Sequence, residues 1–216
     1  MIVNSPLKYD KNDRSVENKK ERSVQVLNEK EERYAWENFI KGDDQSLISI
    51  YRKYADVLYQ YGQQFSKREV FVQDCIQDLF IELIEKRDRL GKANSVKGYL
   101  FSSLKRKIIR QLKKEDKIQL EEGFTFVFEL PAIPIELKEE DLVIVHQMIN
   151  KLPSSQREVI FLYFYQGFSY ADIAEVMGIK VGSARILTYR ALDNLKSSLG
   201  PHLDKFYFFL LFLERL

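Results

Sequence analysis

The sequence has little of what tight turns, disulfide bonds and membrane spans require. Its 216 residues include 9 glycines, 5 prolines and one cysteine, Cys75. So few chain breakers favour helices over a turn-rich β-sandwich, and a single cysteine excludes an internal disulfide and a cysteine-based zinc site. No stretch reaches the ~18 apolar residues of a membrane span, and the N-terminus lacks the apolar run of a signal peptide. We therefore expect a soluble, cytoplasmic protein.

The sequence also lacks the patterns of a catalytic or metal centre. Its two histidines, His146 and His202, lie far apart, and no His or Cys cluster has metal-ligand spacing. Neither a glycine-rich phosphate loop nor a nucleophile elbow is present. Paired acids such as Asp74 and Asp78 are four residues apart, which is more typical of a charged helix face than of acid–base catalysis. We expect no enzyme activity, cofactor, metal or small-molecule substrate.

Charge is distributed in blocks, although the net charge is only +2. Residues 69–85 contain five acidic and no basic residues, residues 86–114 contain eleven basic residues and one acid, and residues 115–141 contain nine acids and two lysines. Separate acidic and basic blocks indicate several charged partners, each bound by its own segment. Solvated helix faces with ordinary charge variation are the alternative interpretation.

Apolar spacing predicts an all-α chain with two small helical domains. After a flexible charged arm at residues 1–30, helical stripes recur through residues 31–114 and can close one bundle. The periodicity fails over residues 115–138, which we interpret as an acidic linker. A short apolar alternation at 124–128 could form a strand, although a lone strand is unstable. Helical spacing returns over residues 139–200.

Residues 170–189 have the plan of a helix-turn-helix. A short helix capped by Ser169 and Asp172 is followed by a turn at Gly178 and by a longer helix from about Val181 to Leu199. A second capping box is predicted from Ser155 and Glu158, at the start of an earlier helix. In the long helix, the residues expected to face inward at four-residue steps are Ala184, Thr188, Ala191 and Leu195. Ile179 is expected to fill the turn.

Three motifs, in order, resemble one family of bacterial transcription proteins. The segments 152–159, 167–174 and 190–195 resemble domain four of sigma factors, and 74–80 resembles the polymerase-binding segment of domain two. Tyr99-Leu100-Phe101 followed by a basic helix resembles the promoter-melting segment. Their order and spacing are similar to those of the extracytoplasmic-function (ECF) group of the sigma-70 family, and the apolar end is similar to that of the Bacteroidota type.

The resemblance implies a function and its residues. The chain would bind core RNA polymerase, through the β′ coiled coil and the β flap, read the −10 and −35 promoter elements and promote DNA opening. The implied polymerase-binding residues are Asp74, Gln77, Asp78 and Phe80. Those implied at the −10 element are Lys97, Tyr99, Lys105, Arg106, Arg110, Lys113 and Lys114. Those implied at the −35 element are Ser183, Arg185, Ile186, Tyr189 and Arg190. Family members are regulated by an anti-sigma factor, which is often membrane-anchored.

Some residues depart from the family pattern. Ile186 and Leu187 replace usual polar residues in the recognition helix, and Arg106 and Arg110 stand where relatives usually carry Asn and Asp. These departures leave two alternatives open: a stand-alone helix-turn-helix regulator, and a degenerate sigma-like protein-interaction module. The apolar tail at 201–216 predicts either an extra helix packed on domain four or a docking segment for a regulator or polymerase.

Overall fold

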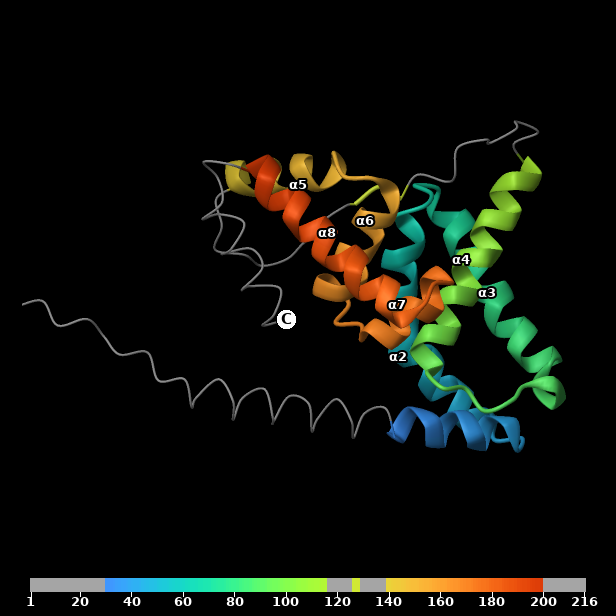
Figure 1. The fold of residues 1–216 in the computed structure, drawn as a ribbon. Helices are drawn as coiled ribbons and strands as arrows, with labels where there is room; N and C mark the ends of the chain where they lie inside the picture. The colour runs from blue at the N-terminus through green and yellow to red at the C-terminus, as the bar shows by residue number, and fades with distance from the viewer. Residues whose placement is uncertain (1–29, 116–125, 129–138, 200–216) are drawn as a thin grey trace, which may run out of the picture.

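The computed structural model describes residues 30–115, 126–128 and 139–199 (Figure 1). In those ranges every regular element is a helix, as the sequence predicts. None of these helices combines the length and the apolar character needed to cross a membrane. The N-terminal arm up to residue 29, most of the linker and the apolar tail lie outside the described residues.

The N-terminal half, residues 30–115, is a helical bundle. Residues 30–40 are helical and are followed by α2 (Asp44–Gln63), α3 (Glu69–Glu85), the short η1 (Arg87–Arg89) and α4 (Val96–Glu115). Most of the predicted apolar stripes are buried, but Tyr51 is 42% exposed at the edge of the bundle. The only tryptophan in the sequence, Trp36, is 2% exposed and donates its indole N–H to the carbonyl of Gly91 at 3.0 Å.

The C-terminal half, residues 139–199, contains the predicted helix-turn-helix. Its elements are α5 (Glu139–Asn150), α6 (Ser154–Ile160), a single π-helical turn η2 (Phe161–Tyr165), α7 (Tyr170–Met177) and α8 (Val181–Leu199). The bounds of α8 agree with the prediction from sequence. Gly178 ends α7 in the left-handed conformation, with φ +67°, and the Ile179 N–H then bonds back to the Ala174 carbonyl at 3.0 Å.

One predicted capping box forms and the other does not. Ser169 accepts the backbone N–H of Asp172 while Asp172 reaches back to the Ser169 N–H, as predicted. The prediction for Ser155 with Glu158 is wrong, because α6 begins at Ser154 behind Pro153 with no side-chain cap. Glu158 instead turns toward the N-terminal half, where a lysine and a phenol bind it. A charge-assisted pair stabilises a carboxylate more than a neutral backbone N–H does.

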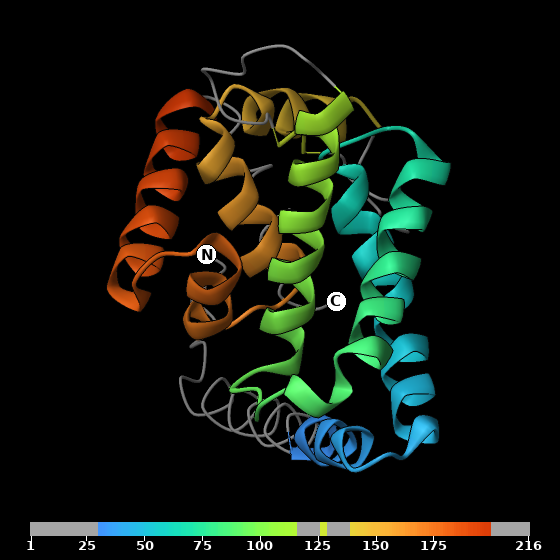
Figure 2. The ribbon, with the colours of Figure 1, turned by 90° about the vertical axis from the view of Figure 1, so that its right-hand side faces the viewer.

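The two halves pack against each other, and α4 is the helix of the N-terminal half that lies at the contact (Figure 2). On one side α4 contacts α2 and α3, and on the other it runs along α7. The Phe101 ring of α4 lies 4.7 Å from the Phe168 ring in a T-shaped contact. The buried residues therefore form one continuous core across both halves.

Three residues of the predicted linker belong to this core. Residues 126–128 form no strand, and Phe126 and Phe128 are 1% and 0% exposed. The interpretation of residues 115–138 as an acidic linker did not anticipate this burial. Two large aromatic side chains gain more from burial between the halves than from exposure to water.

Candidate polymerase and promoter interface

The acidic face of α3 is solvent-exposed. Asp74, Gln77 and Asp78 point outward because the apolar positions of the same helix turn into the bundle. Phe80 does not belong to this face, and grouping it with the exposed acids is corrected. It is 6% exposed and packs edge-on against Tyr51, with ring centroids 4.9 Å apart. Phe80 can therefore support the acidic face only indirectly, by packing in the core under α3.

A buried lysine neutralises the end of the acidic face nearest α4. Lys107 is 5% exposed; its Nζ donates to Glu82 and lies 3.8 Å from Asp78 Oδ2. The hydrogen bond from Lys107 is the largest of the causes that lower the pKa of Glu82. The Glu82 carboxylate therefore connects α3 to α4. Asp74 and Asp78 are the charges of this face that remain more available to a binding partner.

The outer side of α4 presents positive charge. The exposed basic residues are Arg106, Arg110, Lys113 and Lys114. Arg106 Nη2 donates to Ser103 Oγ at 3.1 Å, and Arg110 Nη2 lies 3.7 Å from Glu82 Oε1. These contacts are within or beside α4 and leave the guanidinium groups at the surface, where a phosphate can approach them.

Two other predicted promoter residues of α4 are covered by the C-terminal half. Lys97 Nζ donates to the Gln166 carbonyl at 2.7 Å and lies 3.9 Å from the centroid of the Phe168 ring. Lys105 Nζ contacts both carboxylate oxygens of Glu158, at 2.7 and 2.8 Å. In this arrangement neither ammonium group is available to DNA. Sequence reasoning could not show this, because each partner lies more than fifty residues away.

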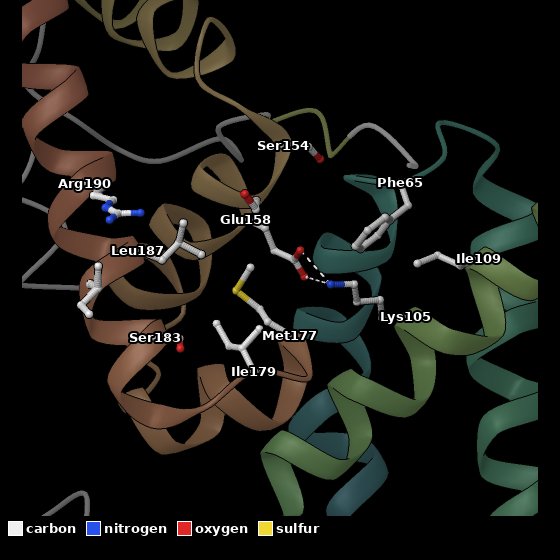
Figure 3. Close-up of a pocket in the computed structure, with 12 residues that line it drawn as sticks. Phe65, Lys105, Ile109, Ser154, Glu158, Met177, Ile179, Ser183, Leu187 and Arg190 are labelled. Atoms are coloured by element: carbon white, nitrogen blue, oxygen red, sulfur yellow. Dashed lines mark hydrogen bonds and ion pairs between the residues drawn. The ribbon is translucent and has the colours of Figure 1, made fainter. Parts of the chain in front are cut away.

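Glu158 is the centre of a buried polar cluster (Figure 3). It is 5% exposed and accepts a 2.6 Å hydrogen bond from the Tyr61 hydroxyl in addition to the two contacts with Lys105. Burial, reinforced by the carboxylate, raises the pKa of the Tyr61 phenol well above its usual range. Tyr61 therefore stays a donor, and the carboxylate of α6 is satisfied entirely by groups from α2 and α4.

Tyr99, the remaining predicted −10 residue, is half-buried at the start of α4. Its ring lies 5.3 Å from Trp36, at an interplanar angle of 58°. The aromatic contact fixes the Tyr99 ring on the N-terminal half rather than on the C-terminal half.

The recognition helix α8 presents the expected outer face. All four residues predicted to face inward are buried, and Thr188 Oγ1 donates to the Ala184 carbonyl at 3.0 Å. The predicted DNA-facing residues are exposed: Ser183, Arg185, Ile186, Tyr189 and Arg190. Ile179 was expected to fill the turn, but it is 36% exposed and lines a cleft instead.

Sequence reasoning missed an aromatic support for Arg185. The Tyr170 and Tyr163 rings stack 5.0 Å apart at 19°, and the Arg185 guanidinium lies 5.3 Å from the Tyr170 centroid. Burial, with a hydrogen bond from the Tyr170 hydroxyl to Tyr163, raises the pKa of Tyr170 to about 12. The neutral ring attracts the cation and restricts its position on the surface.

A cleft of about 820 Å³ separates the two predicted promoter-binding helices (Figure 3). Lys105 and Ile109 of α4 line one side, and Ile186, Leu187 and Arg190 of α8 line the other. One predicted −10 residue, Lys105, therefore shares a cleft with the predicted −35 residues Ile186 and Arg190. No group of three or more potential metal ligands occurs among the residues that the structure describes.

Two family models match the chain and together cover more than half of it. Sigma-70 region 2 matches residues 50–118, and Sigma-70, region 4 matches residues 142–195. The chain belongs to the sigma-70 family. Its relatives include ECF sigma factors, and it is a sigma factor of this ECF group for transcription initiation.

The relatives are distant but align over most of their length. The chain is 25% identical to the ECF sigma factor SigW of Bacillus subtilis over 173 residues, covering 74% of this chain and 91% of SigW. It is 22% identical to SigV of the same organism over 153 residues, covering 71% of this chain and 90% of SigV. A shorter match, 45% over 62 residues, is to SigC of Mycobacterium tuberculosis and covers 29% of this chain and 34% of SigC.

Two solved structures share the fold. CnrH, in complex with the cytosolic domain of CnrY, has a TM-score of 0.56 at 22% identity and covers 79% of this chain and 98% of its own. The sigma factor RpoE from Bartonella quintana, in complex with the anti-sigma factor NepR, has a TM-score of 0.52 at 24% identity, covering 70% and 95%.

Proposed function

We propose that this sigma factor docks on core RNA polymerase through α3, reads the −10 element with α4 and the −35 element with α8. The observation that supports this most directly is the order of three exposed surfaces. An acidic face on α3, a basic face on α4 and an exposed recognition face on α8 lie within the two matched sigma-70 regions. Each surface has the charge that its proposed partner requires.

Polymerase docking depends in this proposal on Asp74 and Asp78, with Gln77 between them. Their charge complements a basic helical rod such as the β′ coiled coil, while the C-terminal half meets the β flap. Asp74→Arg combined with Asp78→Arg should abolish capture by core polymerase. Because both side chains are exposed, each change should alter stability by roughly 0.5 kcal/mol or less.

A control is Asp56→Arg, the same kind of charge reversal at one exposed position of α2. It should leave core binding intact. If the folded double variant binds core polymerase as the unsubstituted chain does, α3 is not the docking surface.

Promoter binding requires the two halves to separate, because Lys97 and Lys105 are covered when they are packed together. Once separated, the full basic side of α4 can hold the non-duplex −10 strand while α8 lies in the major groove upstream. In vitro transcription with core polymerase, followed by sequencing of the transcripts, tests this and defines both elements.

One observation favours a second candidate function, a degenerate protein-interaction module. Ile186 is 53% exposed at the centre of the recognition face and has no hydrogen-bonding atoms. The two candidates differ in outcome: a protein-interaction module would bind core polymerase yet yield no promoter-specific transcripts.

Regulation by an anti-sigma factor, membrane-anchored as in many ECF systems, is part of the proposal. One solved neighbour, the sigma factor RpoE, is in complex with the anti-sigma factor NepR, and the other, CnrH, is in complex with the cytosolic domain of CnrY. A partner that bridges α4 and α8 would keep this chain from polymerase and promoter. We propose that the protein is located in the cytoplasm. Within the ECF group, we propose that it belongs to the Bacteroidota type.

A further inference from the structure

The segment 126–128 is hydrogen-bonded to both halves of the molecule. The Val127 N–H donates to the Gln64 carbonyl at 2.9 Å, directly after α2. The Phe126 N–H donates to Ser154 Oγ at 2.8 Å, at the start of α6. The Asn150 side chain accepts from the Phe128 N–H at 3.0 Å and donates to its carbonyl at 2.9 Å. These bonds satisfy backbone groups that burial without secondary structure would otherwise leave unpaired.

The Phe126 ring bridges the halves as the backbone does, and the Phe128 ring packs beside it on the C-terminal half. The Phe126 centroid lies 5.3 Å from Phe65 and 6.1 Å from Tyr61 in the N-terminal half, and 5.6 Å from Phe161 in the C-terminal half. The Phe128 ring lies 6.1 Å from that of Phe161. Both side chains are almost fully buried, and the Phe126 ring would lose either its N-terminal or its C-terminal packing if the halves moved apart.

Apolar burial, rather than the ion pair, is the main net attraction between the halves. The Lys105–Glu158 pair removes both charges from water. The cost of this desolvation largely offsets the Coulomb attraction between them. Burying an aromatic side chain carries no such charge penalty and is strongly favourable. Burial of the aromatic segment therefore stabilises the packed arrangement of the halves more than the Lys105–Glu158 pair does.

We propose that residues 126–128 are a latch: they hold the halves together in the free chain, keep Lys97 and Lys105 covered, and are released when core polymerase takes up the linker. The covering of α4 follows from the contacts described above. The release step rests on the proposed function, because it requires core polymerase to bind this chain. Polymerase binding and exposure of the promoter surface would then be one coupled event.

The latch can be tested on the free, full-length chain by fluorescence energy transfer. In a Cys75→Ser background, dyes at Gln73→Cys on α3 and Lys196→Cys on α8 report the separation of the halves; both positions are exposed. Phe126→Ala with Phe128→Ala should shift the closed–open equilibrium toward open on the order of a hundredfold, because the Phe126 ring packs on both halves only in the closed state. Energy transfer should fall accordingly.

Two further variants keep the test interpretable. Phe71→Ala removes a ring of the same kind from α3, outside the contact between the halves, and should leave energy transfer unchanged. Ser154→Ala removes only the hydroxyl that accepts the Phe126 N–H, so it should open the chain in part without loss of helical content. Unchanged energy transfer in both the double variant and Ser154→Ala, with helices intact, would overturn the latch.

Binding measurements separate the latch from the proposed function. The free double variant should bind single-stranded −10 DNA at least tenfold more tightly than the unsubstituted chain. The reason is that the open state, in which Lys97 and Lys105 can contact DNA, is more highly populated. Core polymerase should lower energy transfer in the unsubstituted chain. If core polymerase binds but energy transfer stays high, the release step is wrong. If core polymerase does not bind at all, the proposed function fails, and the latch is still judged by the free-chain measurement.

Discussion

At the scale of the residue, the polar cluster around Glu158 determines how the two halves can come apart. Its carboxylate is bound by Lys105 and Tyr61, both from the N-terminal half. Each of these groups can exchange its partner for water, or for a phosphate, only when the halves separate. The cluster is therefore specific for the packed arrangement while adding little net stability to it.

Removing the lysine alone should be costly. Lys105→Met leaves the buried Glu158 carboxylate with one donor, so the free energy of unfolding should fall by about 3 kcal/mol. Adding Glu158→Leu should recover most of that loss. Urea denaturation of the single and double variants measures both effects. Lys92→Met, at a side chain that is 88% exposed, is the control and should change stability by roughly 0.5 kcal/mol or less.

Under the proposed function, Ile186 reads a base through apolar contact. It is exposed between Arg185 and Arg190 and can pack only against the C5-methyl of thymine. Replacing that thymine by uracil should weaken holoenzyme binding by ~1 kcal/mol, about one buried methyl group. In Ile186→Ala the two DNAs should bind alike. If no thymine-to-uracil change in the upstream element alters binding, the protein-interaction alternative gains support.

At the scale of the element, the two serines at helix starts provide a direct comparison. Ser169 caps α7 through a complete capping box, whereas Ser155 makes no cap on α6. Ser169→Ala should therefore lower the free energy of unfolding by about 1 kcal/mol. Ser155→Ala should stay within roughly 0.5 kcal/mol. Thermal melts of the two single variants decide this, and equal losses would contradict the assignment of caps.

The contact between α4 and α7 should depend on pH through Glu175. A Cβ at Gly98 would lie 2.9 Å from Glu175 Oε2, so the carboxylate lies against the α4 backbone. Burial, aided by Asp172 and opposed by Arg106, raises the pKa of Glu175 above its usual 4.5. The folded protein therefore binds this proton more tightly than the unfolded chain, and stability falls as pH rises from 4.5 through the folded pKa.

Glu175→Gln keeps the neutral form at every pH. Its melting temperature should exceed that of the unsubstituted chain at about pH 7, and the two should converge below about pH 4. A difference that does not change with pH would mean that Glu175 titrates normally.

Element positions followed from the sequence because their causes are local. Apolar periodicity and the Ser169 and Gly178 signals placed α4, α7 and α8 correctly. Phe80 was misplaced although its spacing from Ile76 and Leu83 already puts it on the buried face. The other failures could not have been avoided from local patterns. Glu158 binds partners far along the chain instead of forming its predicted cap, and the apolar alternation at 124–128 does not show which part of the molecule covers Phe126 and Phe128.

At the scale of the whole molecule, the packing of the halves divides the basic side of α4 into an open and a covered part. Arg110 and Lys113 are exposed in the free chain, whereas Lys97 and Lys105 are partly buried and their ammonium groups contact the C-terminal half. Salt dependence can count the phosphate contacts made by each part.

In the holoenzyme, Lys97→Ala with Lys105→Ala should reduce the log–log salt slope for single-stranded −10 DNA by about 1.4, or about 0.7 per contact. In the free chain the same variant should leave the slope unchanged. Arg110→Ala with Lys113→Ala is the matched control variant. It should reduce the salt slope in the holoenzyme and in the free chain alike. A loss of slope in the free chain from the first variant would show that the halves are already apart.

Trp36 gives the protein an intrinsic optical probe. Its indole is the only one in the chain, is buried, and lies 5.3 Å from the ring of Tyr99. Any nucleobase that stacks on Tyr99 must alter the surroundings of this single chromophore. Emission excited at the indole band then follows the arrival of the −10 strand in real time, without a dye and without altering a residue, and stopped-flow mixing can resolve the order in which polymerase and promoter act.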